Sequence, residues 1–169
     1  GGNHDADPSH IVVDEYRAAK RLTKSHSIAL DEMLARWKLK RKHLISFVIG
    51  ADAWQVDKEG TSVADEYVAE GWFPGTAKMG RISGAQEILS RLGDEHTAPT
   101  LWFFDNCHGL IGQLPQMQHD PHRPEDVLKV DVDDEGVGGD DYYDALRYGL
   151  QEIGSGIGEV TYGTLGVPR

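Results

Sequence analysis

The chain has 169 residues, of which 39% are hydrophobic, and a formal net charge of −11 from 28 acidic and 17 basic side chains. This length suits one domain, which can bury roughly two thirds of its unfolded surface. The acidic balance excludes binding to nucleic acid or to an anionic membrane through net charge alone, so cations must mediate any such contact. A single cysteine, Cys107, excludes an internal disulfide and a thiolate zinc cluster, and favours a reducing compartment. No apolar run approaches the ~18 residues of a membrane span, so we expect no membrane partner.

The first half of the chain predicts two strands and two helices in alternation. The β-branched segment HIVVDEYRA predicts a strand over 10–18. Apolar residues near helical spacing predict a helix over 25–37. The nearly continuous apolar run HLISFVIGAD predicts a strand over 43–52 that is buried on both faces of a sheet. Thr61 or Ser62 then caps a second helix.

The second half continues the alternation and ends in a glycine-rich tail over 154–169. Its predicted elements are helices over 83–92, 107–114 and 140–153, a buried strand over 100–106 and a short edge strand over 126–132. Strands that alternate with helices indicate an α/β fold with a largely parallel sheet. We find no internal repeat and no second core, so residues 1–153 are predicted to form a single domain.

The last predicted helix opens on three aspartates in the stretch GGDDYYDALRY. Asp140 is its predicted N-cap, with Asp141 and Asp144 in the first turn, and carboxylates there satisfy free N–H groups and complement the helix dipole. Capping is therefore one interpretation. Asp141 and Asp144 are three residues apart, so they project from one face, where like charges repel and a divalent cation is the usual remedy. On this second interpretation Asp144→Asn leaves folding intact or improves it.

Two further aspartates stand where predicted strands end. Asp52 follows the apolar run at its carboxyl end, which is where open α/β sheets place their ligand sites. The alternative role of Asp52 is to turn the chain or to cap a helix. Asp105 ends the strand over 100–106 in the same way and is a further candidate, for an orienting role. The chain contains neither a GxxxxGK[ST] phosphate loop nor an HExxH zinc motif.

Taken in order, these segments resemble the nuclease domain of phage large terminase subunits, the DNA-packaging motors of tailed phages. The resemblance covers about residues 10–152 and is carried by GADAWQ, GRISGAQEILSRL, TLWFFDNCHGLIGQLPQMQ and PEDVLKVDVDDEGVGGDDYYDALRYGL. It implies an RNase H-like fold, a mixed sheet flanked by helices, and an endonuclease that cleaves concatemeric duplex DNA with carboxylate-bound Mg²⁺ or Mn²⁺. Asp52 matches the family's strand-end acid, Asp144 matches the aspartate of its DALRY motif, and Asp141 takes a place often held by histidine or aspartate.

The resemblance also implies partners and a location. The partners are double-stranded DNA, the terminase ATPase domain, the small terminase subunit and the portal, and the location is the host cytoplasm during capsid packaging. The family's first catalytic aspartate lies on a strand before the segment over 10–18, where this chain has only GGNHDADPS. We therefore expect a nuclease domain without its first strand, in which Asp5, Asp7 or Asp14 is the candidate replacement.

The chemistry of the predicted site follows from what phosphodiester hydrolysis needs. A water must become a nucleophile and a leaving oxygen must be stabilised, and two metal ions ~3.5–4 Å apart supply both. Hard cations bind carboxylate oxygens, so Asp52, Asp141 and Asp144 are the predicted catalytic residues and ligands of a two-metal site. The alternative is a catalytically incomplete docking fragment, which packs against the ATPase domain or the portal and uses the aspartates only as helix caps.

Overall fold

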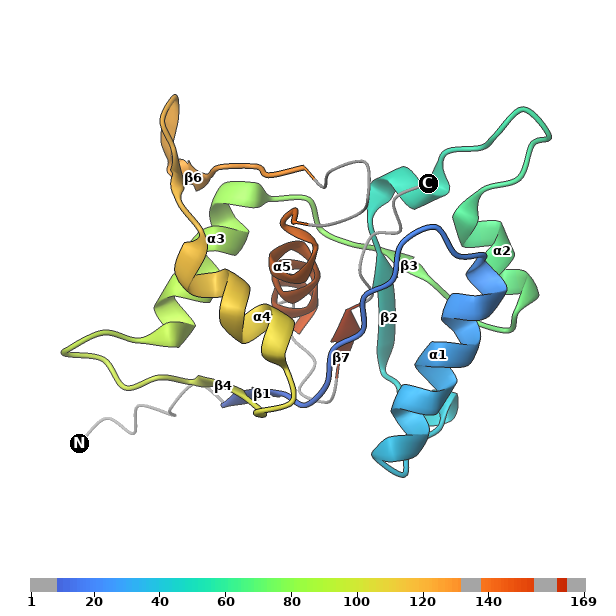
Figure 1. The fold of residues 1–169 in the computed structure, drawn as a ribbon, viewed down its shortest axis with the longest axis horizontal. Helices are drawn as coiled ribbons and strands as arrows, with labels where there is room; N and C mark the ends of the chain where they lie inside the picture. Colours follow the sequence, from blue (N-terminus) through green and yellow to red (C-terminus); the bar gives the residue numbers. More distant parts are fainter. Residues whose placement is uncertain (1–8, 132–137, 154–160, 164–169) are drawn as a thin grey trace, which may run out of the picture.

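The helix α5 (Asp141–Ile153) runs through the middle of the molecule, of which the computed structural model describes residues 9–131, 138–153 and 161–163 (Figure 1). The other helices are α1 (Thr23–Arg36), α2 (Val63–Ala69), α3 (Arg81–Leu92) and α4 (His108–Gln113). In Figure 1, α3 and α4 lie on one side of α5, and the strand β2 with α1 and α2 lies on the other. The described residues form one mixed α/β body.

Seven short strands in the described residues form three separate small sheets. They are β1 (His10–Val12), β2 (Ser46–Ile49), β3 (Gly75–Thr76), β4 (Leu101–Phe103), β5 (His119–Asp120), β6 (Arg123–Val127) and β7 (Thr161–Gly163). β1 pairs with β4, and β2 pairs with both β3 and β7, all in parallel. β5 and β6 form an antiparallel hairpin. The α/β class and the largely parallel pairing are confirmed, whereas the strands do not join into the one mixed sheet that we expected.

The predicted helices are all present. The residues at their ends explain why the sequence predicts their positions well. Ser62 caps α2, because its Oγ accepts a hydrogen bond from the Asp65 amide at 3.1 Å and the Asp65 carboxylate bonds back to Ser62. Gly71 and Gly93 follow α2 and α3 with φ of 83° and 74°, a backbone conformation that glycine adopts without strain. Caps and glycine stops are local signals, which a sequence displays directly.

The predicted strands are longer than the observed ones. The strand predicted over 10–18 covers only His10–Val12, because Asp14 and Glu15 turn their carboxylates to α1 and to the start of α4. The strand predicted over 43–52 covers only Ser46–Ile49, since 3-10 turns form at Arg41–His43 (η1) and Ala51–Trp54 (η2).

The carboxyl-terminal third differs more from prediction. The edge strand predicted over 126–132 instead forms over Arg123–Val127, where it pairs with β5. A third 3-10 turn, η3 (Leu114–Gln116), extends α4. Part of the tail predicted as irregular is the strand β7, which pairs with β2.

The apolar core consists of two main clusters, one on each side of α5. Residues of α1, β2 and α2 form the first cluster, which is centred on Leu34, Phe47 and Tyr67. Residues of α3, α4 and α5 form the second, which includes Leu110 and Leu146. No helix in the described ranges is long and apolar enough to cross a membrane.

Two glycines let α5 lie close to its neighbours. A Cβ on Gly84 of α3 would lie 2.6 Å from Arg147 Cδ, and a Cβ on Gly109 of α4 would lie 2.5 Å from the Tyr142 hydroxyl. Any larger residue at either position would push the helices apart. α5 is therefore held closely on both sides, which fixes the position of the acidic residues on its first turns.

Candidate functional site

Asp52 lies at the predicted place, directly after the buried strand β2. Phe47, Val48 and Ile49 of that strand are buried, whereas Asp52 in the turn η2 is exposed. Among the described residues, none donates a hydrogen bond to its carboxylate or forms an ion pair with it. An exposed carboxylate with both oxygens free, next to a rigid strand, is suited to bind a cation.

Tyr148 of α5 lies near Asp52. The Asp52 Oδ1 atom lies 2.6 Å, and the Tyr148 hydroxyl 3.6 Å, from the point where a Cβ on Gly50 would sit. Burial raises the pKa of Tyr148, and the negative charges of Asp144 and Asp52 raise it further. Tyr148 follows Asp144 by four residues, so the two share a face of α5, and the end of β2 lies near that face.

Asp144 is held by an arginine of its own helix. Arg147 donates hydrogen bonds from Nε, at 3.2 Å, and from Nη2, at 2.9 Å, to the Oδ1 atom of Asp144. The Oδ2 atom of Asp144 accepts no bond from any described residue. One oxygen of Asp144 is thus fixed by the protein and the other remains free to meet a ligand.

Asp140 begins α5 as predicted, because its carbonyl oxygen accepts a 2.9 Å bond from the Asp144 amide. Asp140 is only 5% exposed, and its Oδ2 atom has no partner in the described part of the chain. Burial raises the pKa of the Asp140 carboxyl, and the charge of Asp144 raises it further. The sequence assigned Asp140 a capping role, since an N-cap aspartate and a ligand look identical in sequence.

Asp141 has a different partner. Its Oδ2 atom lies 3.0 Å from Arg17 Nε, and Arg17 also donates a 2.7 Å bond to the Gly138 carbonyl. Arg17 comes from the connection between β1 and α1, so Asp141 ties that connection to the start of α5. The structure thus brings Asp140 to Asp144 and directs Asp141 to Arg17.

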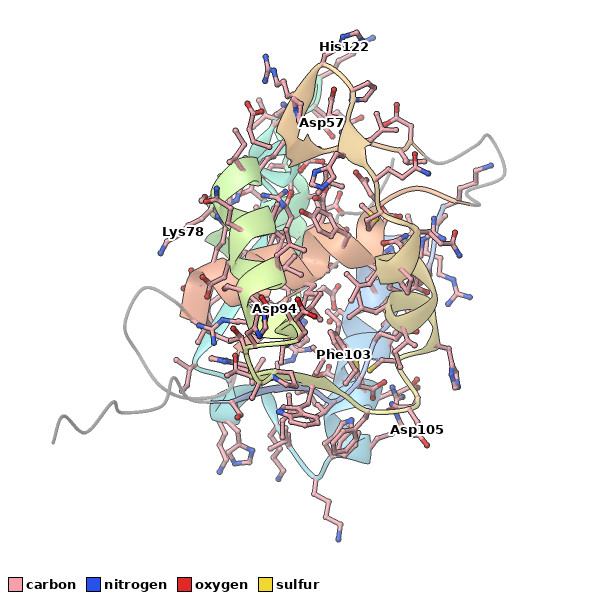
Figure 2. All side chains as sticks on the ribbon, turned by 90° about the vertical axis from the view of Figure 1, so that its left-hand side faces the viewer. Asp57, Lys78, Asp94, Phe103, Asp105 and His122 are labelled. Carbon is pink, nitrogen blue, oxygen red and sulfur yellow. The ribbon has the colours of Figure 1, made fainter. Side chains whose placement is uncertain are left out.

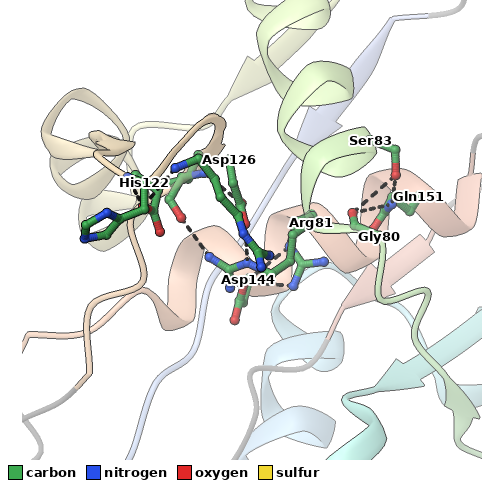
Figure 3. Close-up of polar contacts among 11 residues, drawn as sticks. Gly80, Arg81, Ser83, His122, Asp126, Asp144 and Gln151 are labelled. Atoms are coloured by element: carbon green, nitrogen blue, oxygen red, sulfur yellow. Dashed lines mark hydrogen bonds and ion pairs between the residues drawn. The ribbon is translucent and has the colours of Figure 1, made fainter.

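A second arginine lies beside this group. Arg81, at the start of α3, forms a 3.1 Å ion pair with Asp126 of the β5–β6 hairpin and a 2.8 Å bond to the Val127 carbonyl. Burial opposes its charge, but the hydrogen bond and charge of Asp126, together with the charges of Asp144 and Asp140, raise the Arg81 pKa. Figure 3 shows Arg81 between Asp126 and Asp144. Arg81 therefore fastens the hairpin to the start of α3.

The other acidic candidates lie elsewhere or have structural roles. Asp14 accepts bonds from Arg36 Nη2 at 2.8 Å and from Trp37 Nε1 at 2.9 Å, which anchors α1. Asp5 and Asp7 lie outside the described residues. Asp105 is exposed after β4, and Figure 2 shows it at the opposite end of the molecule from the hairpin residue His122.

The chemical type of the donor atoms at this site suits a hard cation. Asp52, Asp140 and Asp144 offer carboxylate oxygens without histidine or cysteine beside them, which favours Mg²⁺ or Mn²⁺ over zinc. Within the described ranges, no three His, Cys, Asp or Glu side chains lie close enough together to hold a metal ion. A cation bound here would therefore take its remaining oxygens from water or from a substrate phosphate.

Comparisons with protein-family models, with curated proteins and with solved structures gave no match to this chain.

Proposed function

We propose that this chain is the RNase H-like nuclease domain of a viral DNA-packaging terminase, a metal-dependent endonuclease that cleaves concatemeric duplex DNA. The observation that carries the proposal is that Asp52, at the end of β2, lies near the hydroxyl of Tyr148, which shares a face of α5 with Asp144 four residues earlier. Both carboxylates have an oxygen without a partner among the described residues. Such a pair of free carboxylates from two rigid elements is what cation binding requires.

The proposed mechanism assigns each aspartate a role. Asp52 and Asp144 would hold the cation through carboxylate oxygens, and water or a substrate phosphate would supply its remaining ligands. Asp141 holds Arg17 and so fixes the first turn of α5. When bound, Mg²⁺ or Mn²⁺ activates the attacking water and stabilises the leaving oxygen of the phosphodiester.

The proposed substrate and partners are those that the resemblance to phage large terminases implies. Double-stranded DNA is the substrate, and the ATPase domain, the small terminase subunit and the portal are the protein partners, in the host cytoplasm. The net charge of −11 repels DNA, so bound cations must offset it before the backbone can approach. We therefore expect weak, sequence-independent cleavage that depends on metal.

Nicking of supercoiled plasmid across a Mn²⁺ series tests the proposal. Asp52→Ala and Asp144→Ala should each lower the nicking rate about 100-fold or more, because each removes a ligand. Asp105→Ala is the matched control, since it removes an exposed strand-end aspartate outside the group, and it should nick like the wild type. Equal rates for Asp52→Ala, Asp105→Ala and the wild type would contradict the proposed function.

The second candidate is a docking fragment, and one observation favours it. Ile11 and Trp102 are register partners on the β1–β4 sheet, and they are 56% and 52% exposed. Adjacent exposed apolar side chains of this size suit a protein contact. Under this alternative the protein binds no Mn²⁺ and Asp52→Ala has no effect, whereas Trp102→Ser abolishes binding to the terminase ATPase domain.

A further inference from the structure

Arg147 is a fully buried charge, with 1% of its surface exposed. Two of its nitrogens, Nε and Nη2, bond to Asp144 Oδ1, while its Nη1 atom has no partner in the described part of the chain. A buried charged group without its full set of bonds lowers stability, and apolar residues often replace such groups without loss. A role beyond stability would account for an arginine at this position.

The surroundings of Arg147 fix its position. Its guanidinium carbon lies 4.6 Å from the centre of the Tyr148 ring, so the cation stacks on the aromatic face. Gly84 of α3 leaves the space that the Arg147 stem fills, because a Cβ there would lie 2.6 Å from Arg147 Cδ. The guanidinium is therefore held from two sides, and it holds Asp144 in turn.

We infer that Arg147 is a positioning residue for Asp144, and that it sets how tightly the site binds a cation. By occupying Oδ1, it leaves Asp144 a single free oxygen, so that Asp144 binds the cation through Oδ2 alone. Its positive charge beside the ligand also weakens the attraction between Asp144 and the cation. This inference rests on the proposed function, because it concerns the same metal site.

The inference predicts two opposite effects of one substitution. Arg147→Met keeps an unbranched side chain in the space beside Gly84 but removes the charge and both bonds to Asp144. Mn²⁺ should then bind about tenfold more tightly, since the opposing charge is gone and both oxygens of Asp144 are free. Plasmid nicking at saturating Mn²⁺ should slow about tenfold or more, because the orientation of Asp144 is lost. A merely structural role would not tighten Mn²⁺ binding.

Two further variants separate charge, geometry and folding. Arg147→Lys keeps the charge without the two-nitrogen grip on Oδ1, so Mn²⁺ affinity should stay near the wild-type value while nicking slows. Arg91→Met is the matched control. Arg91 is a largely buried helix arginine, paired with Glu87 at 2.6 Å outside the site, and its loss should change neither Mn²⁺ affinity nor nicking.

The experiment is Mn²⁺ titration followed by electron paramagnetic resonance, with plasmid nicking at saturating Mn²⁺, on variants shown to be folded by circular dichroism. Tighter binding with slower nicking in Arg147→Met, and unchanged values in Arg91→Met, are expected. Affinity in Arg147→Met that is equal to or weaker than in the wild type overturns the inference. If Arg147→Met does not fold, the nicking rate of Arg147→Lys tests the inference instead. A rate in Arg147→Lys equal to that of the wild type overturns the inference. Should the wild type bind no Mn²⁺, the proposed function fails first and the inference falls with it.

Discussion

The polar side chains on the two sides of the molecule differ in how completely they are hydrogen-bonded. On the side of α1 and α2, Arg41 donates to Asp31 at 2.7 Å and to the Glu70 carbonyl at 2.5 Å, and it stacks 4.3 Å from the Trp72 ring centre. The Trp72 indole donates in turn to Ser27 Oγ at 2.8 Å. These bonds close a network that joins α1, η1 and the end of α2.

On the side of α5, several buried polar atoms have no hydrogen-bond partner among the described residues. Five buried side-chain atoms in the described residues lack a hydrogen-bond partner, and four of them lie on α5 or at its start: Asp140 Oδ2, Tyr143 Oη, Arg147 Nη1 and Gln151 Oε1. The fifth, His26 Nε2, lies on α1. Buried polar groups normally find partners, so open ones gathered on one helix mark the part of the fold that is arranged for something other than stability.

The largest expected effect is on the closed side. Arg41→Ala should lower the free energy of unfolding by about 2–3 kcal/mol, because it removes four hydrogen bonds and an aromatic contact from the network. Urea denaturation measures the loss. Mn²⁺ affinity of the folded variant should equal that of the wild type, and a changed affinity would show that the two sides are not independent.

Gly84→Ala tests how closely α3 and α5 pack. The added methyl meets the Arg147 side chain, so the free energy of unfolding should fall by about 1–2 kcal/mol despite the better helix propensity of alanine. Gly112→Ala is the matched control, since a Cβ there meets no atom within 4 Å, and it should be neutral or stabilising. Equal stability of the two variants would mean that Arg147 can move freely, and the close packing would be refuted.

Asp144→Asn shows where the structure changes an expectation from the sequence. Repulsion between aspartates led us to expect neutral or improved stability. Because Asp144 is the counter-charge of the buried Arg147, the substitution should instead lower the free energy of unfolding of the metal-free protein by about 1 kcal/mol. Thermal denaturation without metal decides between the two expectations.

Asp140→Asn should have the smallest effect, and one that depends on pH. The folded protein holds the Asp140 carboxyl at a pKa above its ordinary 3.8, so the unfolded chain loses this proton first as pH rises. The wild type therefore loses stability above about pH 3.8, through the raised pKa, whereas the asparagine variant does not. The variant should match the wild type in stability below that range and exceed it near neutral pH. Urea denaturation at several pH values checks this, and an advantage that is largest in acid would reverse the argument.

The sequence located what local patterns determine. The helices follow from apolar spacing, from the Ser62 cap and from glycine stops, and Asp52 follows from its place after an apolar run. Pairing over long distances was not predictable in this way. No local sequence pattern indicates that β7 pairs with β2 or that Arg17 forms an ion pair with Asp141. The packing of Arg147 against Gly84 is equally invisible in the sequence.

The predicted strand lengths were wrong for a related reason. The residues after Val12 look like strand in sequence, yet Asp14 and Glu15 leave it because donors on α1 and at the start of α4 attract them. Asp140 stands at the predicted N-cap position, but the burial of its unpartnered Oδ2 atom depends on neighbours that the sequence does not display.

The most direct test of the account is whether Asp52 and Asp144 bind one cation together. Mn²⁺ titration followed by electron paramagnetic resonance should show binding with a dissociation constant in about the millimolar range, as expected for few carboxylate ligands. Asp52→Asn and Asp144→Asn should each weaken it about tenfold or more, whereas Asp105→Asn should leave it unchanged. Equal Mn²⁺ binding by the wild type and all three variants would contradict the account.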